Sequence, residues 1–418
     1  MDITITPRRL RGTIEAPPSK SAAHRALICA ALCGEGESVL HGLSPSQDIL
    51  ATLEVLRALG AKIDLQDGTA RVTGIISPPK SAVCDCRESG STLRFLLPVA
   101  GALGVNATFL GAGNLPRRPY SLLAGQMERH GVAFSRSSGM PFSIGGRLRP
   151  GWYELPGDVS SQYVSGLLFA LPLLGRGSDI ALSTPLQSAG YVEMTIAALR
   201  RFGIRIEERP YGWHVPGRQC YRPREEKIEA DYSNAAFWLC AGALDSPVAC
   251  AGLDPQSPQG DRAIIRLLQG FGARCEGGDP LSVQGGRLHG CRIDASQVPD
   301  LVPILAVVAA LSEGETLIEN AGRLRIKECD RLAAMADCLT RLGAKVCEGP
   351  DYLCITGSPT LRGGEVNGWG DHRIVMACAI AATRCESSVT ILGAQAVEKS
   401  YPDFFHHYRE LGGKINVL

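Results

Sequence analysis

Residues 339–346 read Leu-Thr-Arg-Leu-Gly-Ala-Lys-Val, which is the end of an amphipathic helix, a glycine and the start of a strand. Similar phrases surround six glycines along the chain, namely Gly60, Gly131, Gly203, Gly272, Gly343 and Gly412. Successive glycines lie 71, 72, 69, 71 and 69 residues apart. One such helix-to-strand junction is common in α/β proteins and means little by itself. Six of them at nearly constant spacing predict six repeated α/β units.

Each unit is longer than the repeats of solenoid proteins and is expected to contain its own small sheet. Apolar residues recur at helical spacing from Ile49 to Leu59, while Ile63 and Leu65 alternate with polar residues as in a half-buried strand. Second helices are predicted over residues 22–32 and 92–103. The sequence therefore predicts an α/β protein of two similar domains, each made of three repeated subdomains.

The boundary between these domains is expected where the composition changes. The third unit ends near Ile206, and residues 210–232 are rich in proline, glycine, arginine and glutamate, as in an interdomain crossover. The segment Ala16-Pro17-Pro18 is the expected second crossover. We predict a discontinuous domain of residues 1–18 plus 228–418, with residues 19–227 as an inserted domain.

Composition excludes several classes of protein. The chain has 418 residues with 43 Lys and Arg against 42 Asp and Glu, so its net charge of +1 argues against a nucleic-acid platform. Residues 1–10 lack the apolar core of a signal peptide, and the longest apolar run, 301–311, is too short to span a bilayer. The 15 cysteines show no CxxC spacing, which favours buried thiols in a reducing compartment. We expect a cytoplasmic monomer with no nucleic-acid or membrane partner.

Several predicted helix starts carry hydroxyl groups, glycine or cations. These starts are Ser19–Ser21 with Arg25, residues 87–94, Arg117–Pro119, Ser160–Gln162 and Ser188–Tyr191. Free N–H groups and a partial positive charge make a helix N-terminus a good anion site. The start at Ser19–Ser21 could equally be an ordinary serine cap beside two solvated cations. Their recurrence in nearly every unit favours a cleft between the domains for small ligands that carry phosphates and carboxylates.

The second half adds carboxylates beside cations. Asp300 precedes an apolar run and is either a helix cap or a carboxylate at the floor of a cleft. Residues 325–331 hold three cations and two acids, a pattern that is also usual on an exposed helix face. Asp371–Arg373 opens another apolar helix, and Lys399 follows a predicted strand.

Taken in order, seven motifs resemble the 5-enolpyruvylshikimate-3-phosphate (EPSP) synthase family over essentially the whole chain. They are SKSxxxR at 19–25, SGSTLR at 89–94, RRP at 117–119, SSQ at 160–162, RIKECDR at 325–331, DHR at 371–373 and KSYPDF at 399–404. The resemblance implies two inside-out α/β domains with mixed sheets. It also implies transfer of the enolpyruvyl group of phosphoenolpyruvate to the 5-hydroxyl of shikimate 3-phosphate, with release of phosphate and without a metal or organic cofactor.

The resemblance also assigns substrate-binding residues, with the inserted domain on the shikimate 3-phosphate side and the discontinuous domain on the phosphoenolpyruvate side. Those expected to bind shikimate 3-phosphate are Lys20, Ser21, Arg25, Ser160, Ser161, Gln162 and Ser188, and Tyr191 and Asp300 are also expected to bind substrate. Those expected to bind phosphoenolpyruvate are Gly90, Arg118, Gln162, Arg331, Arg373 and Lys399. A planar Arg fork suits the carboxylate, and a Lys suits the phosphate.

By the same resemblance, Asp300 is the base that takes the 5-hydroxyl proton and Glu328 is the acid that protonates the methylene carbon. Lys327 binds the shikimate side and stabilises developing charge, Lys20 lies between the two substrates, and His372 supports Glu328. One carboxylate must be ionised and the other protonated, so their surroundings must separate their pKa values.

The chain departs from the family pattern at four positions. Glu88, Ser91 and Phe95 stand where many members carry Asn, Thr and Pro. Arg323 lies where an Asn often contacts shikimate 3-phosphate, and it is left out of the predicted site for that reason.

Three other functions stay open. A UDP-N-acetylglucosamine enolpyruvyltransferase has the same fold and second substrate, but it usually uses a loop cysteine as acid, and no cysteine here lies in a matching glycine-rich loop. An RNA terminal-phosphate cyclase has related repeats and would need a basic RNA-binding face. A non-catalytic anion-binding module would leave Asp300 and Glu328 without a purpose.

Overall fold

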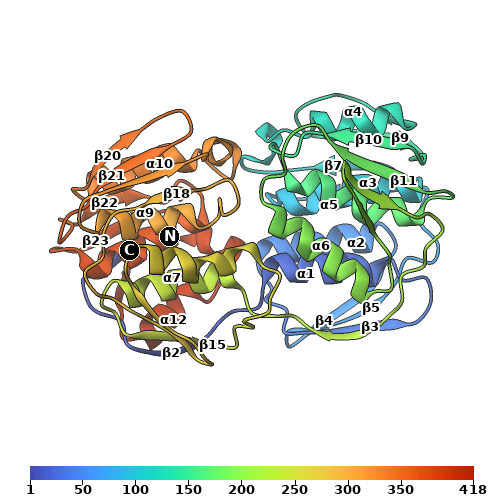
Figure 1. Ribbon diagram of the computed structural model, residues 1–418. Helices are drawn as coiled ribbons and strands as arrows, with labels where there is room; N and C mark the ends of the chain where they lie inside the picture. The colour runs from blue at the N-terminus through green and yellow to red at the C-terminus, as the bar shows by residue number, and fades with distance from the viewer. The chain divides into compact units, whose positions relative to one another are not determined.

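The computed structural model describes residues 1–418 and divides the chain into two compact units, each of which contains three of the six repeats. From here on, the word unit refers to these two halves of the chain. The first unit comprises Met1–Ser19 and Glu229–Leu418, and the second, inserted unit comprises Lys20–Ile228. Both junctions lie one residue further along the chain than the boundaries expected from composition. In Figure 1 the inserted unit runs from blue to green, and the first unit from yellow to red with the blue N-terminal segment.

The inserted unit contains six α-helices, the short 3₁₀ helices η1 (Leu115–Arg117) and η2 (Leu171–Leu173), and three four-stranded mixed sheets in the orders β14-β3-β5-β4, β6-β7-β9-β8 and β10-β11-β13-β12. Its helices are α1 (Lys20–Ala31), α2 (Gln47–Ala58), α3 (Gly90–Leu103), α4 (Ser121–Arg129), α5 (Ser161–Ala170) and α6 (Ala189–Arg201). Its strands are β3 (Glu37–His41), β4 (Lys62–Gln66), β5 (Thr69–Thr73), β6 (Ser81–Asp85), β7 (Asn106–Leu110), β8 (Val132–Phe134), β9 (Phe142–Gly146), β10 (Trp152–Leu155), β11 (Ser178–Leu182), β12 (Glu207–Arg209), β13 (Gly212–Val215) and β14 (Glu225–Lys227). Helices α1 and α3 each begin two residues before their predicted starts.

The first unit repeats this composition, with sheets in the orders β22-β23-β1-β24, β16-β17-β15-β2 and β18-β19-β21-β20. Its helices are α7 (Tyr232–Ala243), α8 (Ile264–Gly270), α9 (Val302–Ala310), α10 (Arg331–Arg341), α11 (His372–Ala381) and α12 (Phe404–Glu410), with short 3₁₀ helices η3 (Gly260–Ala263), η4 (Gly322–Ile326), η5 (Ala382–Arg384) and η6 (Ala394–Lys399). Its strands are β1 (Ile3–Thr6), β2 (Gly12–Glu15), β15 (Val248–Ala251), β16 (Arg274–Glu276), β17 (Leu281–Gln284), β18 (Arg292–Asp294), β19 (Glu315–Glu319), β20 (Lys345–Glu348), β21 (Leu353–Thr356), β22 (Gly364–Asn367), β23 (Val389–Leu392) and β24 (Lys414–Val417).

All six sheets share one pattern of strand directions. One edge strand pairs in parallel with its neighbour, as β18 does with β19, and the other two pairings are antiparallel, as in β19-β21-β20. Two strands belong to a different unit from the helix that follows them in sequence. Strand β2 precedes α1 but pairs with β15, and β14 precedes α7 but pairs with β3. This exchange makes the first unit discontinuous in sequence.

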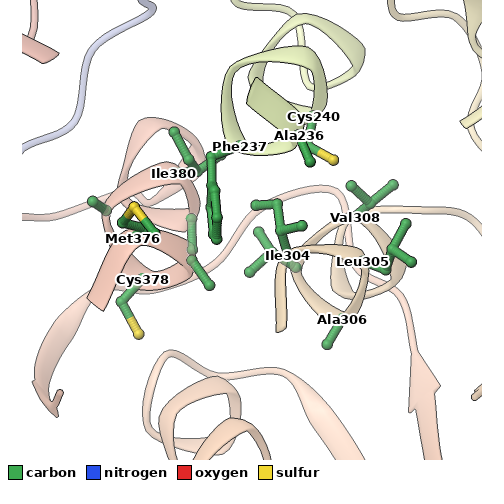
Figure 2. Close-up of a cluster of buried hydrophobic side chains, with 14 of the residues drawn as sticks. Ala236, Phe237, Cys240, Ile304, Leu305, Ala306, Val308, Met376, Cys378 and Ile380 are labelled. Carbon is green, nitrogen blue, oxygen red and sulfur yellow. The ribbon is translucent and has the colours of Figure 1, made fainter. Parts of the chain in front are cut away.

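One helix of each repeat is buried along nearly its whole length, and these helices are α1, α3, α5, α7, α9 and α11. A helix that is apolar all round belongs inside a protein, so the helices form the core of each unit and the sheets lie outside them. Figure 2 shows this core in the first unit, where Phe237 of α7 points into the space between Ile304 of α9 and Ile380 of α11. The predicted inside-out α/β architecture is therefore confirmed for each unit.

The six repeated glycines follow α2, α4, α6, α8, α10 and α12, and their φ angles lie between 83° and 109°. An L-residue is strained at such angles whereas glycine adopts them freely. We call these six helices, which are not the buried helices of the core, the outer helices. Each of them ends at a backbone conformation that requires glycine, and this requirement explains the repeated phrase in the sequence.

Two further observations concern the chain as a whole. None of its helices has the length and apolar character needed to cross a membrane. All 15 cysteines are free thiols, and ten of them are buried, as expected for small apolar residues.

Candidate active site

Four cations and one amide lie near the N-termini of buried helices in the inserted unit. We call this group, which consists of Lys20, Arg25, Arg94, Arg118 and Gln162, the arginine cluster. Helices α1, α3 and α5 begin at Lys20, Gly90 and Ser161. The Ser89 and Ser160 side chains accept hydrogen bonds from the backbone N–H of Thr92 and Gln162, at 3.2 and 3.3 Å. Each of these serines therefore caps its helix and satisfies one N–H group of the first turn.

Lys20 and Arg25 are held by partners on other helices. Nζ of Lys20 donates to Oδ2 of the buried Asp48 at 2.7 Å. The buried Arg25 donates from Nε to the Thr195 hydroxyl at 2.8 Å, and from Nη2 to the backbone oxygen of Tyr191 at 2.7 Å. Burial lowers the pKa of Arg25 to about 10, which still leaves it protonated at neutral pH. These two cations of the cluster are therefore held in place by α2 and α6.

Gly90 lies directly against two guanidinium groups. A Cβ at this position would sit 2.7 Å from Nη1 of Arg94 and 2.8 Å from Nη1 of Arg118. Arg94 in turn donates to Oε1 of Gln162 at 2.9 Å, and Nε2 of Gln162 donates to the Ser91 hydroxyl at 2.9 Å. The absence of a side chain at Gly90 thus lets two cations approach the N-terminus of α3, where an anion is favoured.

Two departures from the family pattern take part in this cluster. Ser91 accepts the hydrogen bond from Gln162, and the Phe95 ring centroid lies 5.2 Å from Cζ of Arg25, within the range of a cation–π interaction.

Ser188, at the start of α6, has a φ of +57°, a conformation rare for serine that signals local strain. Ser188 is the N-cap residue of α6.

The first unit contains the second group of predicted residues, and we call Asp300, Glu328, Arg331, Asp371 and Arg373 the carboxylate cluster. Arg331, the first residue of α10, is its centre. Its Nη1 donates to Oδ1 of Asp300, its Nη2 to Oε2 of Glu328 and its Nε to Oδ2 of Asp371, at 2.8, 2.8 and 2.7 Å. One guanidinium therefore orients both predicted proton-transfer groups.

Asp300 is surrounded by cations. Burial alone would raise the pKa of its carboxyl, but Arg373, Lys327 and Arg331 together lower it well below its usual value. Nη2 of Arg373 lies 3.2 Å from Oδ2, and Nζ of Lys327 lies 3.5 Å from Oδ1. Asp300 is consequently ionised at neutral pH, as the predicted base must be before reaction. Burial lowers the pKa of Lys327 to about 8, although Asp300 opposes that shift.

Two predicted residues lie less directly in this network. His372 is buried at the first position of α11, and its Nδ1 is 3.6 Å from Oδ1 of Asp371. Lys399 is buried at the end of η6. Their predicted roles, support of Glu328 and binding of phosphoenolpyruvate, stay predictions.

Sequence reasoning missed two buried carboxylates. Asp48 holds Lys20, and its only signal was a polar residue in the first turn of an otherwise apolar helix. Asp261 in η3 accepts a hydrogen bond from the Ser233 hydroxyl, and burial followed by repulsion from Asp300 raises its pKa to about 6. Nothing in the local sequence distinguishes Asp261 from a surface turn residue.

These features define an inside-out α/β protein with cations near helix N-termini and a pair of carboxylates held on one arginine. Residues 5–408 match the family model described as EPSP synthase (3-phosphoshikimate 1-carboxyvinyltransferase). The chain belongs to this family. The family predicted from the seven motifs, and with it the predicted enzyme class, is therefore confirmed.

Individual relatives agree with this assignment. Proteins named 3-phosphoshikimate 1-carboxyvinyltransferase from Clostridium perfringens and Clostridium acetobutylicum are 45% and 47% identical to the chain. The matches cover 98% of the chain and of the first relative, and 99% of the chain and 98% of the second. The solved EPSP synthase of Acinetobacter baumannii superposes with a TM-score of 0.82 at 25% identity over both full lengths. An enolpyruvyl transferase from Streptomyces tendae shares the fold, with a TM-score of 0.78 at 20% identity over 99% of this chain and 98% of its own.

Proposed function

We propose that the protein transfers the enolpyruvyl group of phosphoenolpyruvate to the 5-hydroxyl of shikimate 3-phosphate, and that the arginine and carboxylate clusters serve this one reaction. The family assignment supports this activity over the three alternatives that the sequence had left open. The observation that carries the residue roles is the fork of Arg331, which holds Asp300 on one nitrogen and Glu328 on the other.

In this proposal, the inserted unit supplies most of the substrate contacts. Lys20, Ser21, Arg25, Ser160, Ser161, Gln162, Ser188 and Tyr191 bind shikimate 3-phosphate, while Gly90, Arg118, Gln162, Arg331, Arg373 and Lys399 bind phosphoenolpyruvate. The support is chemical, because N–H groups at helix starts bind phosphate and buried guanidinium forks bind carboxylate. Lys20, already paired with Asp48, is the cation assigned to lie between the two substrates.

In the proposed reaction, one carboxylate removes a proton and the other donates one. Asp300 takes the proton of the 5-hydroxyl while the oxygen of that hydroxyl bonds to C2 of phosphoenolpyruvate, and Glu328 gives a proton to the methylene carbon. Phosphate then leaves from C2, the new methyl carbon returns its proton to Glu328, and the proton on Asp300 passes to phosphate or solvent. Lys327 stabilises the charge that develops on the shikimate side, and His372 supports Glu328.

The low pKa of Asp300 in the ligand-free protein makes it a weak base. All three cations that lower this pKa are also assigned to the substrates, Arg373 and Arg331 to phosphoenolpyruvate and Lys327 to the shikimate side. When substrates take up part of that positive charge, the pKa of Asp300 rises towards the value that a general base requires. Substrate binding thereby activates the base.

The test is phosphate release from phosphoenolpyruvate, with shikimate 3-phosphate or UDP-N-acetylglucosamine as acceptor. We expect release only with shikimate 3-phosphate, and a loss of kcat of at least ~100-fold in Asp300→Asn and in Glu328→Gln. Glu319→Gln, which alters an exposed ion pair with Arg292, is the matched control and should retain activity. Release with the other acceptor, or full activity in either carboxylate variant, would contradict the proposal.

We also propose the partners, the cellular compartment and the oligomeric state of the protein. The partners are the two small-molecule substrates, and we place the protein in the cytoplasm as a monomer without a nucleic-acid or membrane partner. The free thiols support a reducing compartment. Size-exclusion chromatography with light scattering would test the monomeric state.

A further inference from the structure

Lys327 and Glu328 lie on a short non-helical stretch between η4 and α10. Such a stretch has no backbone ladder of its own, so other contacts must hold it if Glu328 is to deliver a proton to one carbon atom. The stretch begins beside Arg325, a residue that the sequence analysis noted only as part of a charged run.

Arg325 ties this stretch to the turn between β20 and β21. Its Nε donates to the backbone oxygen of Pro350 at 2.8 Å, and its Nη2 to that of Gly349 at 2.6 Å. Its Nη1 lies 2.8 Å from Oε1 of Glu348 at the end of β20. A backbone hydrogen bond of 2.8 Å from Ala321 to Asp351 joins the same two segments. The turn therefore serves as an anchor for the chain that leads into the cluster.

The same guanidinium also reaches the far end of the stretch. Nη1 of Arg325 donates to Oδ2 of Asp330 at 2.7 Å, while the other oxygen of Asp330 accepts from the N–H of Ala333 and caps α10. The next residue is Arg331, which carries Asp300 and Glu328 on its fork. Arg325 thus closes both ends of the stretch, through an anchor before Lys327 and a helix cap after Glu328.

We infer that Arg325 is a positioning residue, which fixes the stretch of Lys327 and Glu328 by clamping it between the β20–β21 turn and the cap of α10. The inference rests on the proposed role of Glu328 as the acid. A lysine keeps the charge but is a point donor, so it cannot reproduce the planar fork that reaches two backbone oxygens and two carboxylates.

The test compares Arg325→Met and Arg325→Lys with the wild type, with kcat and KM determined for each substrate. We expect Arg325→Met to lower kcat by ~10- to 100-fold with a smaller change in the KM for phosphoenolpyruvate, because a small displacement of the acid slows chemistry more than binding. Arg325→Lys should restore only part of kcat. The matched control is Arg287→Met, which removes an exposed Arg with two hydrogen bonds to Glu313 and should not change kcat. Wild-type kcat in Arg325→Met, or full rescue by lysine, would overturn the inference.

A double-mutant cycle separates this inference from the proposed function. If Arg325 acts through Glu328, Arg325→Met should reduce the residual activity of Glu328→Gln much less than it reduces that of the wild type. Independent, multiplicative losses would overturn the positioning role while leaving Glu328 as the acid. Full activity in Glu328→Gln would instead remove the acid, and with it the basis of the inference. Should Arg325→Met fail to fold, Arg325→Lys and Glu348→Gln can each be combined with Glu328→Gln in the same cycle. Losses of kcat that multiply in these cycles would equally overturn the positioning role of Arg325.

Discussion

Nη1 of Arg331 and Oδ1 of Asp300 lie 2.8 Å apart, and the Arg331 side chain is only 2% exposed. The same guanidinium also contacts Glu328 and Asp371. Burial would lower the pKa of Arg331, but Asp371, Glu328 and Asp300 raise it well above its usual value. One buried cation therefore contacts three carboxylates, and we expect both stability and activity to depend on it.

Arg331→Met should destabilise the first unit strongly. Removing one partner of a buried ion pair leaves uncompensated charge and typically costs about 3–5 kcal/mol. The expected result is a clear drop in the thermal midpoint, together with loss of activity. Arg287→Met, which breaks an exposed pair with Glu313, should leave the midpoint almost unchanged. Equal shifts in the two variants would mean that the Arg331 network adds no stability.

The pKa of Lys327 predicts weaker ligand binding at alkaline pH. Partial burial lowers this pKa to about 8, so the ligand-free protein loses a cation of the cluster as the pH rises through that value. The affinity for shikimate 3-phosphate should therefore fall above about pH 8, as measured by calorimetry from about pH 6.5 to 9.5. Lys327→Arg should abolish this decline, since arginine stays protonated over the whole range. An identical decline in the variant would assign the titration to another group.

Gly90→Ala should impair binding more than folding. The added Cβ would meet the guanidinium ends of Arg94 and Arg118 at 2.7 and 2.8 Å, and these flexible ends can move away at little cost in stability. Their displacement removes cations from the start of α3, so the KM for phosphoenolpyruvate should rise by ~10-fold or more, which corresponds to about 1.4 kcal/mol. Steady-state kinetics checks this, and an unchanged KM would show that neither guanidinium contacts that substrate.

The repeated glycines make a stability prediction. Gly343 has a φ of +94°, and a Cβ there would lie 3.0 Å from Cγ of Arg362, so Gly343→Ala should cost about 1–2 kcal/mol. Gly125 lies inside α4 with no atom within 4 Å of an added Cβ. Gly125→Ala should therefore stabilise the protein by about 0.5–1 kcal/mol. Chemical denaturation of both variants tests the contrast, and the same sign of change in both would contradict it.

Local sequence was sufficient for much of the fold. The end of each outer helix at glycine and the serine caps of α3 and α5 depend on neighbours within a few residues, so both were predictable. The starts of α1 and α3 were misplaced by two residues, because the first turn of each carries lysine, serine or glycine rather than apolar side chains.

The charged networks were less accessible to sequence reasoning. Lys20 and Asp48 are 28 residues apart, and Arg331 and Asp371 are 40 apart, so no local pattern connects them. Asp261 and Arg325 look like ordinary surface charges in the sequence, yet one is buried and the other clamps the chain before the proposed acid.

By itself, the sequence determined the six repeats, the two-domain organisation expected from them and the family, because backbone geometry at glycine and ordered motifs are written in adjacent residues. Only the tertiary structure decided which carboxylates share Arg331, which guanidiniums lie against Gly90 and how far the pKa values of Asp300 and Lys327 move. These properties depend on distances of a few ångströms between residues far apart in the chain and on their removal from water, and packing alone sets both.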